Sequence, residues 1–113
     1  MWVPSLEEWL PSRVKAVNET WIRRCDGRLF FVETRENHSA DVISLGIRGG
    51  RQHLTEKSVA AFTYLYNHHL HDFARFLKGD DDTFVVVENL RYLLEQYNPN
   101  QPVYLGHLFK FAH

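Results

Sequence analysis

Three adjacent aspartates, Asp80, Asp81 and Asp82, are the residues whose types and spacing best suit chemistry in this sequence. Their carboxylates repel one another, so a fold that places them at the end of an apolar strand needs a compensating cation. In an extended chain, alternate side chains point the same way, so Asp80 and Asp82 can converge while Asp81 points elsewhere. Two oxygen ligands suit Mn²⁺ or Mg²⁺, with waters and diphosphate oxygens completing the shell. The alternative is a solvated acidic turn that caps the helix after it.

Other groups of reactive side chains offer weaker patterns. His68 and His71 would share one helix face, but no carboxylates are interleaved as in a zinc-protease motif, which favours a polar helix end. The segment from Gly46 to Gly50 lacks the spacing and the lysine of a phosphate-binding loop. Cys25 is the single cysteine, which excludes an internal disulfide and favours a buried thiol, or half of an external disulfide, over a nucleophile.

Short apolar runs alternate with helical segments along the chain. Helices are expected at 13–24, 55–71 and 88–97, and strands at 29–32, 41–45, 73–77 and 103–106. This order predicts an α/β protein with a mostly parallel sheet, which binds ligands at the carboxyl ends of its strands. The acidic triplet follows such an end.

Two local features of these elements can be checked directly. Gly27 suits the left-handed position that closes the first helix. The apolar stripe expected on the second helix consists of Val59, Phe62, Leu65, Tyr66 and Leu70.

Length and composition allow one compact domain. The chain has 113 residues, 44% of them hydrophobic, and 13 basic against 14 acidic residues. That balance removes the basic footprint of a nucleic-acid binder, so no nucleic acid is expected as a partner. No apolar run is long enough to span a membrane, and residues 1–12 lack the features of a secretory signal.

Several ordered motifs carry a family resemblance. They are FLKGDDDTF at 76–84, NLRYLL at 89–94, PVYLG at 102–106 followed by Phe109-Lys110, and TWxxRC at 20–25, with Lys57 in the helix between. From about Arg13 to Lys110 the chain resembles the core 1 type β-1,3-galactosyltransferases of glycosyltransferase family 31.

The resemblance implies a partial GT-A fold, Rossmann-like, with a mostly parallel sheet and flanking helices. It also implies that residues 13–113 correspond only to the N-terminal, nucleotide-sugar-binding half of this fold. The chain would therefore be truncated at both ends relative to the family. Residues 1–12 form a divergent segment that does not resemble the family's first strand. The acceptor pocket and the catalytic base are expected in the second half of the family domain, so this chain alone is expected to be weakly active or inactive.

The resemblance also implies an activity and its site. The reaction is inverting transfer of galactose from UDP-galactose, in β-1,3 linkage, to O-linked N-acetylgalactosamine of glycoproteins, with Mn²⁺ (or Mg²⁺) as cofactor. Asp80 and Asp82 would bind the metal, and Asp81, Arg13, Thr20 and Lys57 would lie on the nucleotide-sugar side.

Partners and location follow from the same resemblance. A homo- or heterodimer with a family member and a location in the Golgi lumen are expected. The alternative is a non-catalytic, chaperone-like interaction module that does not need the aspartates. Two glycosylation triplets begin at Asn18 and Asn37, and their use stays open.

Overall fold

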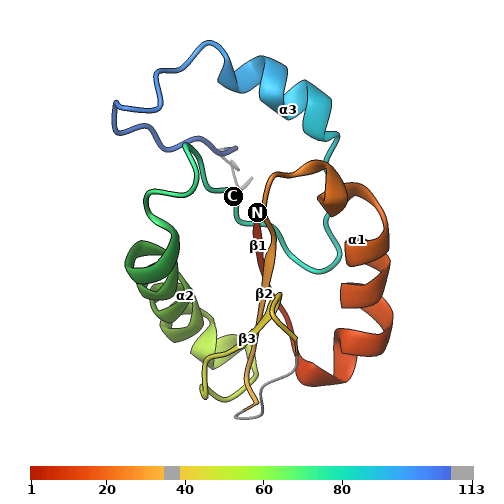
Figure 1. The fold of residues 1–113 in the computed structure, drawn as a ribbon. Coiled ribbons are helices and arrows are strands. Elements are labelled where there is room, and N and C mark those ends of the chain that lie inside the picture. Colours follow the sequence, from red (N-terminus) through yellow and green to blue (C-terminus); the bar gives the residue numbers. More distant parts are fainter. Residues whose placement is uncertain (35–38, 108–113) are drawn as a thin grey trace, which may run out of the picture.

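The core of the protein is a three-stranded parallel sheet. A computed structural model describes residues 1–34 and 39–107. Strands β1 (Trp2–Pro4), β2 (Leu29–Val32) and β3 (Val42–Ser44) lie in the order β1-β2-β3 (Figure 1). The expected α/β class and the two strands predicted at 29–32 and 41–45 are therefore confirmed.

Strand β1 corrects the expectation that residues 1–12 hold no sheet strand. Trp2 and Val3 are buried, and Val3 lies opposite Phe30 of β2. The backbone N–H of Ser5 donates to the carbonyl of Phe31 at 2.9 Å, which extends the pairing past Pro4. A strand of three residues that ends at a proline has too few positions to show a period in the sequence.

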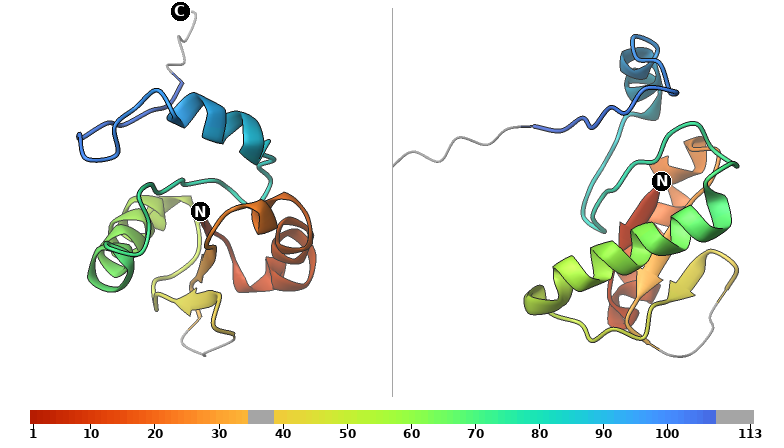
Figure 2. Two further views of the ribbon diagram at one scale, coloured as in Figure 1. Left: turned by 45° about the horizontal axis from the view of Figure 1, so that its top comes forward. Right: turned by 90° about the vertical axis from the view of Figure 1, so that its left-hand side faces the viewer.

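Helical segments cover both faces of this sheet. The helix predicted at 13–24 is divided into three elements and begins earlier: a π-helical turn η2 (Leu10–Val14), the helix α1 (Lys15–Glu19) and a 3₁₀ turn η3 (Trp21–Arg24). The long helix α2 (Leu54–His69) lies on the opposite face, as Figures 1 and 2 show. A further helix, α3 (Val87–Leu94), lies beyond the sheet and contacts η3.

The core has one apolar cluster on each face, and β2 contributes to both. Phe30 packs with Val3 and Trp21 on the α1 face, whereas Phe31 packs with Trp2 and Leu65 on the α2 face. A strand buried on both faces is a continuous apolar run, which explains why 29–32 was readily predicted.

The apolar stripe predicted on α2 is largely wrong. Leu65 is buried, but Val59, Phe62, Tyr66 and Leu70 are exposed. The buried face instead consists of Lys57, Ala61 and Leu65, at i, i+4 and i+8. Apolar residues are spread around much of this helix, so the sequence period does not say which narrow side meets the sheet.

The strand predicted at 73–77 is replaced by a single parallel bridge between Trp2 and Lys78. The N–H of Trp2 donates to the carbonyl of Leu77 at 2.8 Å, and the N–H of Gly79 donates to the carbonyl of Trp2 at 3.1 Å. Just upstream, Arg75 donates to the carbonyl of Leu94, which ends α3, and to the carbonyl of Tyr97 beyond it. The bridge is enough to bring the acidic triplet to the carboxyl end of β1.

The strand predicted at 103–106 is also absent from the described part of the chain. These residues extend away from the sheet, and Tyr104 is 96% exposed (Figure 2). An apolar, β-branched run forms a strand only where an edge is available to pair with it, which local sequence does not record.

Gly27 does not adopt the left-handed conformation expected of it. Among the described residues, positive φ occurs at Gly46 (+66°) and Gly50 (+107°), both in the predicted glycine-rich loop. At Gly27 the constraint is a close neighbour, because a Cβ there would lie 2.4 Å from Cζ of Phe73.

Candidate functional site

A polar cavity of about 360 Å³ lies where β1, the start of α2 and the acidic triplet meet. Its walls include three basic side chains and three acidic ones, namely Arg13, Arg51, Lys57, Asp80, Asp81 and Asp82. Pro4 ends β1 and Ser5 follows it, and the triplet follows the Lys78 bridge, so both segments leave the sheet at its carboxyl edge. This is the edge at which parallel α/β sheets bind ligands.

The acidic triplet lies in a turn, not in the extended geometry expected for it. The N–H of Thr83 donates to the carbonyl of Asp80 at 3.1 Å, and the N–H of Asp80 donates to the Thr83 hydroxyl at 3.0 Å. Asp80 and Asp82 are exposed in this turn, whereas Asp81 is half-buried. The residue at the N-cap of α3 is Val86, with no side-chain cap, so the triplet does not cap that helix.

Asp81 is held by two side chains from the N-terminal segment. The Ser5 hydroxyl donates to Oδ2 of Asp81 at 2.6 Å, and the Arg13 guanidinium lies 3.4 Å from Oδ1. The guanidinium also lies over the indole of Trp9, with Cζ 4.2 Å from the ring centroid. Asp81 therefore uses both carboxylate oxygens within the protein.

Lys57 brings a buried ammonium group to the same cavity. Its Nζ donates to the carbonyl of Ser5 at 3.2 Å and lies 4.0 Å from the carboxylate of Glu33. Burial lowers the pKa of Lys57 from its ordinary value, and the negative charge of Glu33 opposes that shift. Both oxygens of Glu33 also accept from the N–H of Glu7.

Five of the six predicted site residues thus line one cavity, and Thr20 does not. The Thr20 hydroxyl donates to the carbonyl of Ala16 at 2.7 Å, at the end of α1. Sequence reasoning missed Ser5, Trp9 and Arg51. The i, i+4 spacing of Trp9 and Arg13 was the available signal for their contact.

The donor set can be tested against the expected Mn²⁺ or Mg²⁺. Within residues 1–34 and 39–107, no three His, Cys, Asp or Glu side chains lie close enough together to hold a metal ion. The Asp80 carboxylate lies 3.6 Å from the Lys78 ammonium. The Asp82 carboxylate has no hydrogen bond or ion pair with any residue in the described part of the chain. Two exposed carboxylates fit a hard cation that draws its other ligands from water and phosphate.

The histidines of α2 take structural contacts. The ring of His68 contacts the carbonyl of Tyr64 at 2.9 Å, and His69 lies 3.0 Å from Asp72. This agrees with the polar helix end that the sequence favoured over a ligand set. Cys25 is half-buried against the α1-face cluster. Asn37 lies outside the described residues, whereas the side-chain oxygen Oδ1 of Asn18 accepts from Nε of Arg28 at 2.6 Å.

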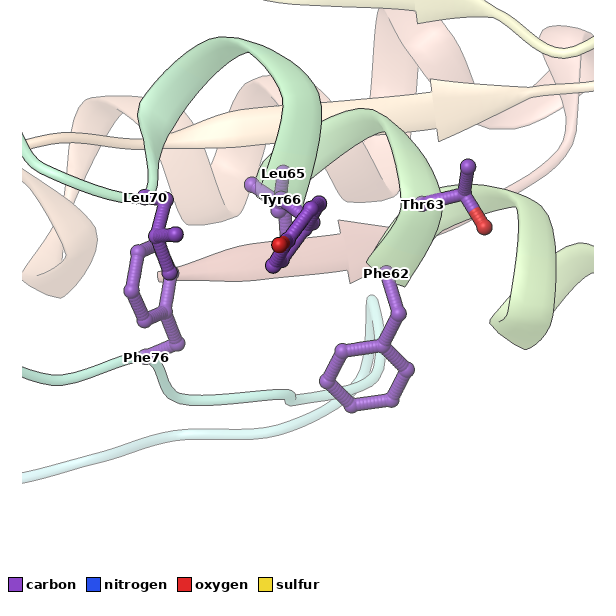
Figure 3. Close-up of a pocket in the computed structure, with 6 residues that line it drawn as sticks. All are labelled: Phe62, Thr63, Leu65, Tyr66, Leu70 and Phe76. Carbon is purple, nitrogen blue, oxygen red and sulfur yellow. The ribbon is translucent and has the colours of Figure 1, made fainter.

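A second cavity, of about 410 Å³, has a different character. It lies between α2 and the segment that follows this helix, and it is lined by Phe62, Thr63, Leu65, Tyr66, Leu70 and Phe76 (Figure 3). These residues include no charged group that could bind a diphosphate or a cation. The polar cavity is therefore the candidate functional site.

Comparison with known proteins identifies relatives over nearly the whole chain. Glycoprotein-N-acetylgalactosamine 3-beta-galactosyltransferase 1 of Xenopus laevis is 36% identical over 110 residues, which cover 96% of this chain and 30% of that protein. Chondroitin sulfate synthase 3 of Mus musculus is 28% identical over 92% of the chain and 13% of its own length. The Mus musculus beta-1,3-glucosyltransferase is 24% identical over 97% of the chain and 22% of its own length.

The chain thus spans less than a third of the length of each of these relatives. None of the helices in the described residues is both long and apolar enough to cross a membrane. Residues 3–110 match the family described as Fringe-like, and this match begins within β1. Two of these three relatives carry the names of glycosyltransferases, and the chain belongs to the Fringe-like family, glycosyltransferase family 31.

Proposed function

We propose that this chain forms the donor-binding part of a glycosyltransferase that moves galactose from UDP-galactose, in β-1,3 linkage, to O-linked N-acetylgalactosamine of glycoproteins. The observation that carries the proposal is the convergence of Arg13, Lys57 and the acidic triplet on one cavity at the carboxyl edge of the sheet. The 36% identity to a relative named for this reaction supports the choice of donor and acceptor.

The charges of the cavity suit a diphosphate bound together with a cation. Three carboxylates alone would repel the negative oxygens of UDP. Arg13, Arg51 and Lys57 offset three negative charges, and the guanidinium of Arg13 keeps unused donors because its side chain is 47% exposed. A sugar diphosphate in this cavity could therefore meet basic groups together with a carboxylate-bound ion.

The chemistry of the proposed reaction is nucleophilic substitution at the anomeric carbon. The acceptor hydroxyl attacks from the face opposite UDP, and a carboxylate base accepts its proton. Mn²⁺ or Mg²⁺ at Asp80 and Asp82 would offset the negative charge that grows on the departing diphosphate. Arg13 and Lys57 bind and orient the donor, and Asp81 keeps the acidic turn against the end of β1.

The test is titration of the folded chain with UDP in the presence of Mn²⁺, by calorimetry. We expect saturable binding that disappears in Asp82→Asn and when Mn²⁺ is removed with a chelator. Glu95→Gln is the matched control, because it removes one exposed carboxylate that does not line the cavity. Absence of metal-dependent UDP binding in the unaltered chain would refute the proposal.

The identity of the sugar is a separate question, because one relative is named a galactosyltransferase and another a glucosyltransferase. Competition of UDP-galactose, UDP-glucose and UDP against a bound fluorescent UDP analogue would compare the donors. We expect UDP-galactose to compete best. A preference for UDP-glucose would be consistent with the proposed metal and nucleotide site, but it would contradict the assignment of galactose as the transferred sugar.

The second candidate function is a non-catalytic interaction module. The exposed apolar side chains of α2, which include Val59, Phe62 and Tyr66, favour it. Such a module would keep its binding to a protein partner in Asp80→Asn/Asp82→Asn and would lose it in Phe62→Ser/Tyr66→Ser. The donor-site function instead predicts that UDP binding is lost in Asp80→Asn/Asp82→Asn and kept in Phe62→Ser/Tyr66→Ser.

A further inference from the structure

Ser5 and Lys57 are the two polar side chains that the described part of the chain buries, with 6% and 4% of their surfaces exposed. They lie side by side at the wall of the polar cavity. Burial of a polar group costs free energy unless its hydrogen bonds are satisfied, so both require partners here.

Ser5 meets this requirement by contacting three different elements. Its N–H donates to the carbonyl of Phe31 in β2, and its carbonyl accepts from Lys57 in α2. Its hydroxyl donates to Asp81, 76 positions away along the chain. One small residue therefore connects the sheet, the long helix and the acidic turn.

The turn itself has few other attachments. The two hydrogen bonds between Asp80 and Thr83 are internal to it, and the ion pair of Asp80 with Lys78 is local in the chain. Directly before the turn, the N–H of Gly79 donates to the carbonyl of Trp2 at 3.1 Å. The side-chain hydrogen bonds that join residues 80–83 to more distant parts of the described chain come through the Asp81 carboxylate, from Ser5 at 2.6 Å and from Arg13 at 3.4 Å. The Ser5 contact is shorter, and it comes from a buried residue whose backbone is fixed on both sides.

We propose that Ser5 is a positioning residue for the donor site, which holds Asp81 so that Asp80 and Asp82 stay available at the cavity for a divalent cation and a nucleotide diphosphate. This inference rests on the proposed function. A ligand set held in place before binding does not lose conformational entropy on binding, so its affinity is higher. Partners that orient metal ligands from behind are commonly worth about 10- to 100-fold in metal affinity.

The central variant is Ser5→Ala, with Ser5→Thr as the conservative variant that keeps the hydroxyl. Ser39→Ala is the matched control, because it removes the same atom from an exposed residue that does not line the cavity. Asp81→Asn tests the contact from the other side and remains informative if Ser5→Thr does not fold. The double variant Ser5→Ala/Asp81→Asn completes a cycle that isolates the coupling of the two side chains.

Two measurements on each folded variant distinguish this inference from the proposed function. The first is amide hydrogen exchange of residues 80–83 in the ligand-free protein, and the second is the dissociation constant for UDP with Mn²⁺. In Ser5→Ala we expect faster exchange at the turn and about 10-fold weaker binding. Ser5→Thr should restore both, and the losses in the double variant should be less than additive.

Unchanged exchange at 80–83 and unchanged affinity in Ser5→Ala would overturn the positioning role while leaving the donor site intact. If the unaltered chain binds no UDP with Mn²⁺, the proposed function fails. In that case, unchanged exchange at 80–83 in Ser5→Ala overturns the positioning role of Ser5 as well. Faster exchange there supports the role of Ser5 in holding the turn in place.

Discussion

The ammonium of Lys57 lies 3.2 Å from the backbone carbonyl of Ser5, to which it donates a hydrogen bond. The contact joins the first turns of α2 to the chain that leaves β1, and it places a positive charge beside the acidic turn. Because the side chain is buried, its protonation is linked to both the stability of the fold and the charge of the cavity.

Lys57→Met should change how stability depends on pH. The pKa of Lys57 is lowered in the folded protein, so between that value and 10.5 the unfolded chain binds more protons than the folded one. Stability contributed by this group therefore rises with pH across that window. Urea unfolding of both proteins from about pH 7 to 10.5 should show the unaltered chain gaining stability relative to Lys57→Met. A constant difference would contradict the linkage.

The same ionisation should appear in nucleotide binding. A neutral Lys57 no longer attracts a diphosphate, so UDP affinity should fall with rising pH below the range of an ordinary lysine. Calorimetry at constant ionic strength would measure the profile. Lys57→Met should bind more weakly at neutral pH and lack this slope. An identical slope in the two proteins would assign the titration to another group.

Phe31→Ala should cause one of the larger losses of stability in the chain. Phe31 is fully buried between β1 and α2, with ring contacts to Trp2 and Tyr64. Removing a buried phenylalanine costs about 3–5 kcal/mol, from lost transfer free energy and the cavity left behind. Tyr66→Ala, at a side chain 66% exposed, should change the free energy of unfolding by less than about 0.5 kcal/mol. Equal losses in urea unfolding would contradict this placement of the core.

The local sequence pattern was sufficient to predict the strand at 29–32 and the existence of the helix α2. The strand at 29–32 is apolar throughout because both of its faces are covered, and α2 has the length and period of a helix. The sequence could not orient α2, because the exposed Val59 and Phe62 are as apolar as the buried Leu65. It also could not indicate whether 103–106 would find a strand edge, since pairing depends on distant chain.

The residues of the candidate site also differ in whether the sequence could predict them. Asp80 and Asp82 were identified from residue type and spacing, because adjacent carboxylates need either solvent or a cation. Arg13 and Lys57 entered through the resemblance, and they line the cavity. Ser5 was not recognisable, because nothing local to a serine after Pro4 predicts a contact with Asp81. Thr20 shares a motif with the family but contacts its own helix.

Gly27→Ala should destabilise the fold for a steric reason. The added Cβ would lie 2.4 Å from Cζ and 2.9 Å from Cε1 of Phe73, and the backbone there is not in the left-handed region. Displacing a packed ring costs about 1–3 kcal/mol. Gly106→Ala is the control, because a Cβ there meets nothing within 4 Å.

Phe73→Leu tests whether the ring is the cause of that loss. The smaller side chain leaves room for the new methyl group, so Gly27→Ala should cost less in the Phe73→Leu background than in the unaltered chain. Urea unfolding of the four proteins gives this coupling as a double-mutant cycle. A cost that is the same in both backgrounds would show that Gly27 is required for its backbone conformation, which is the explanation that the sequence alone had favoured.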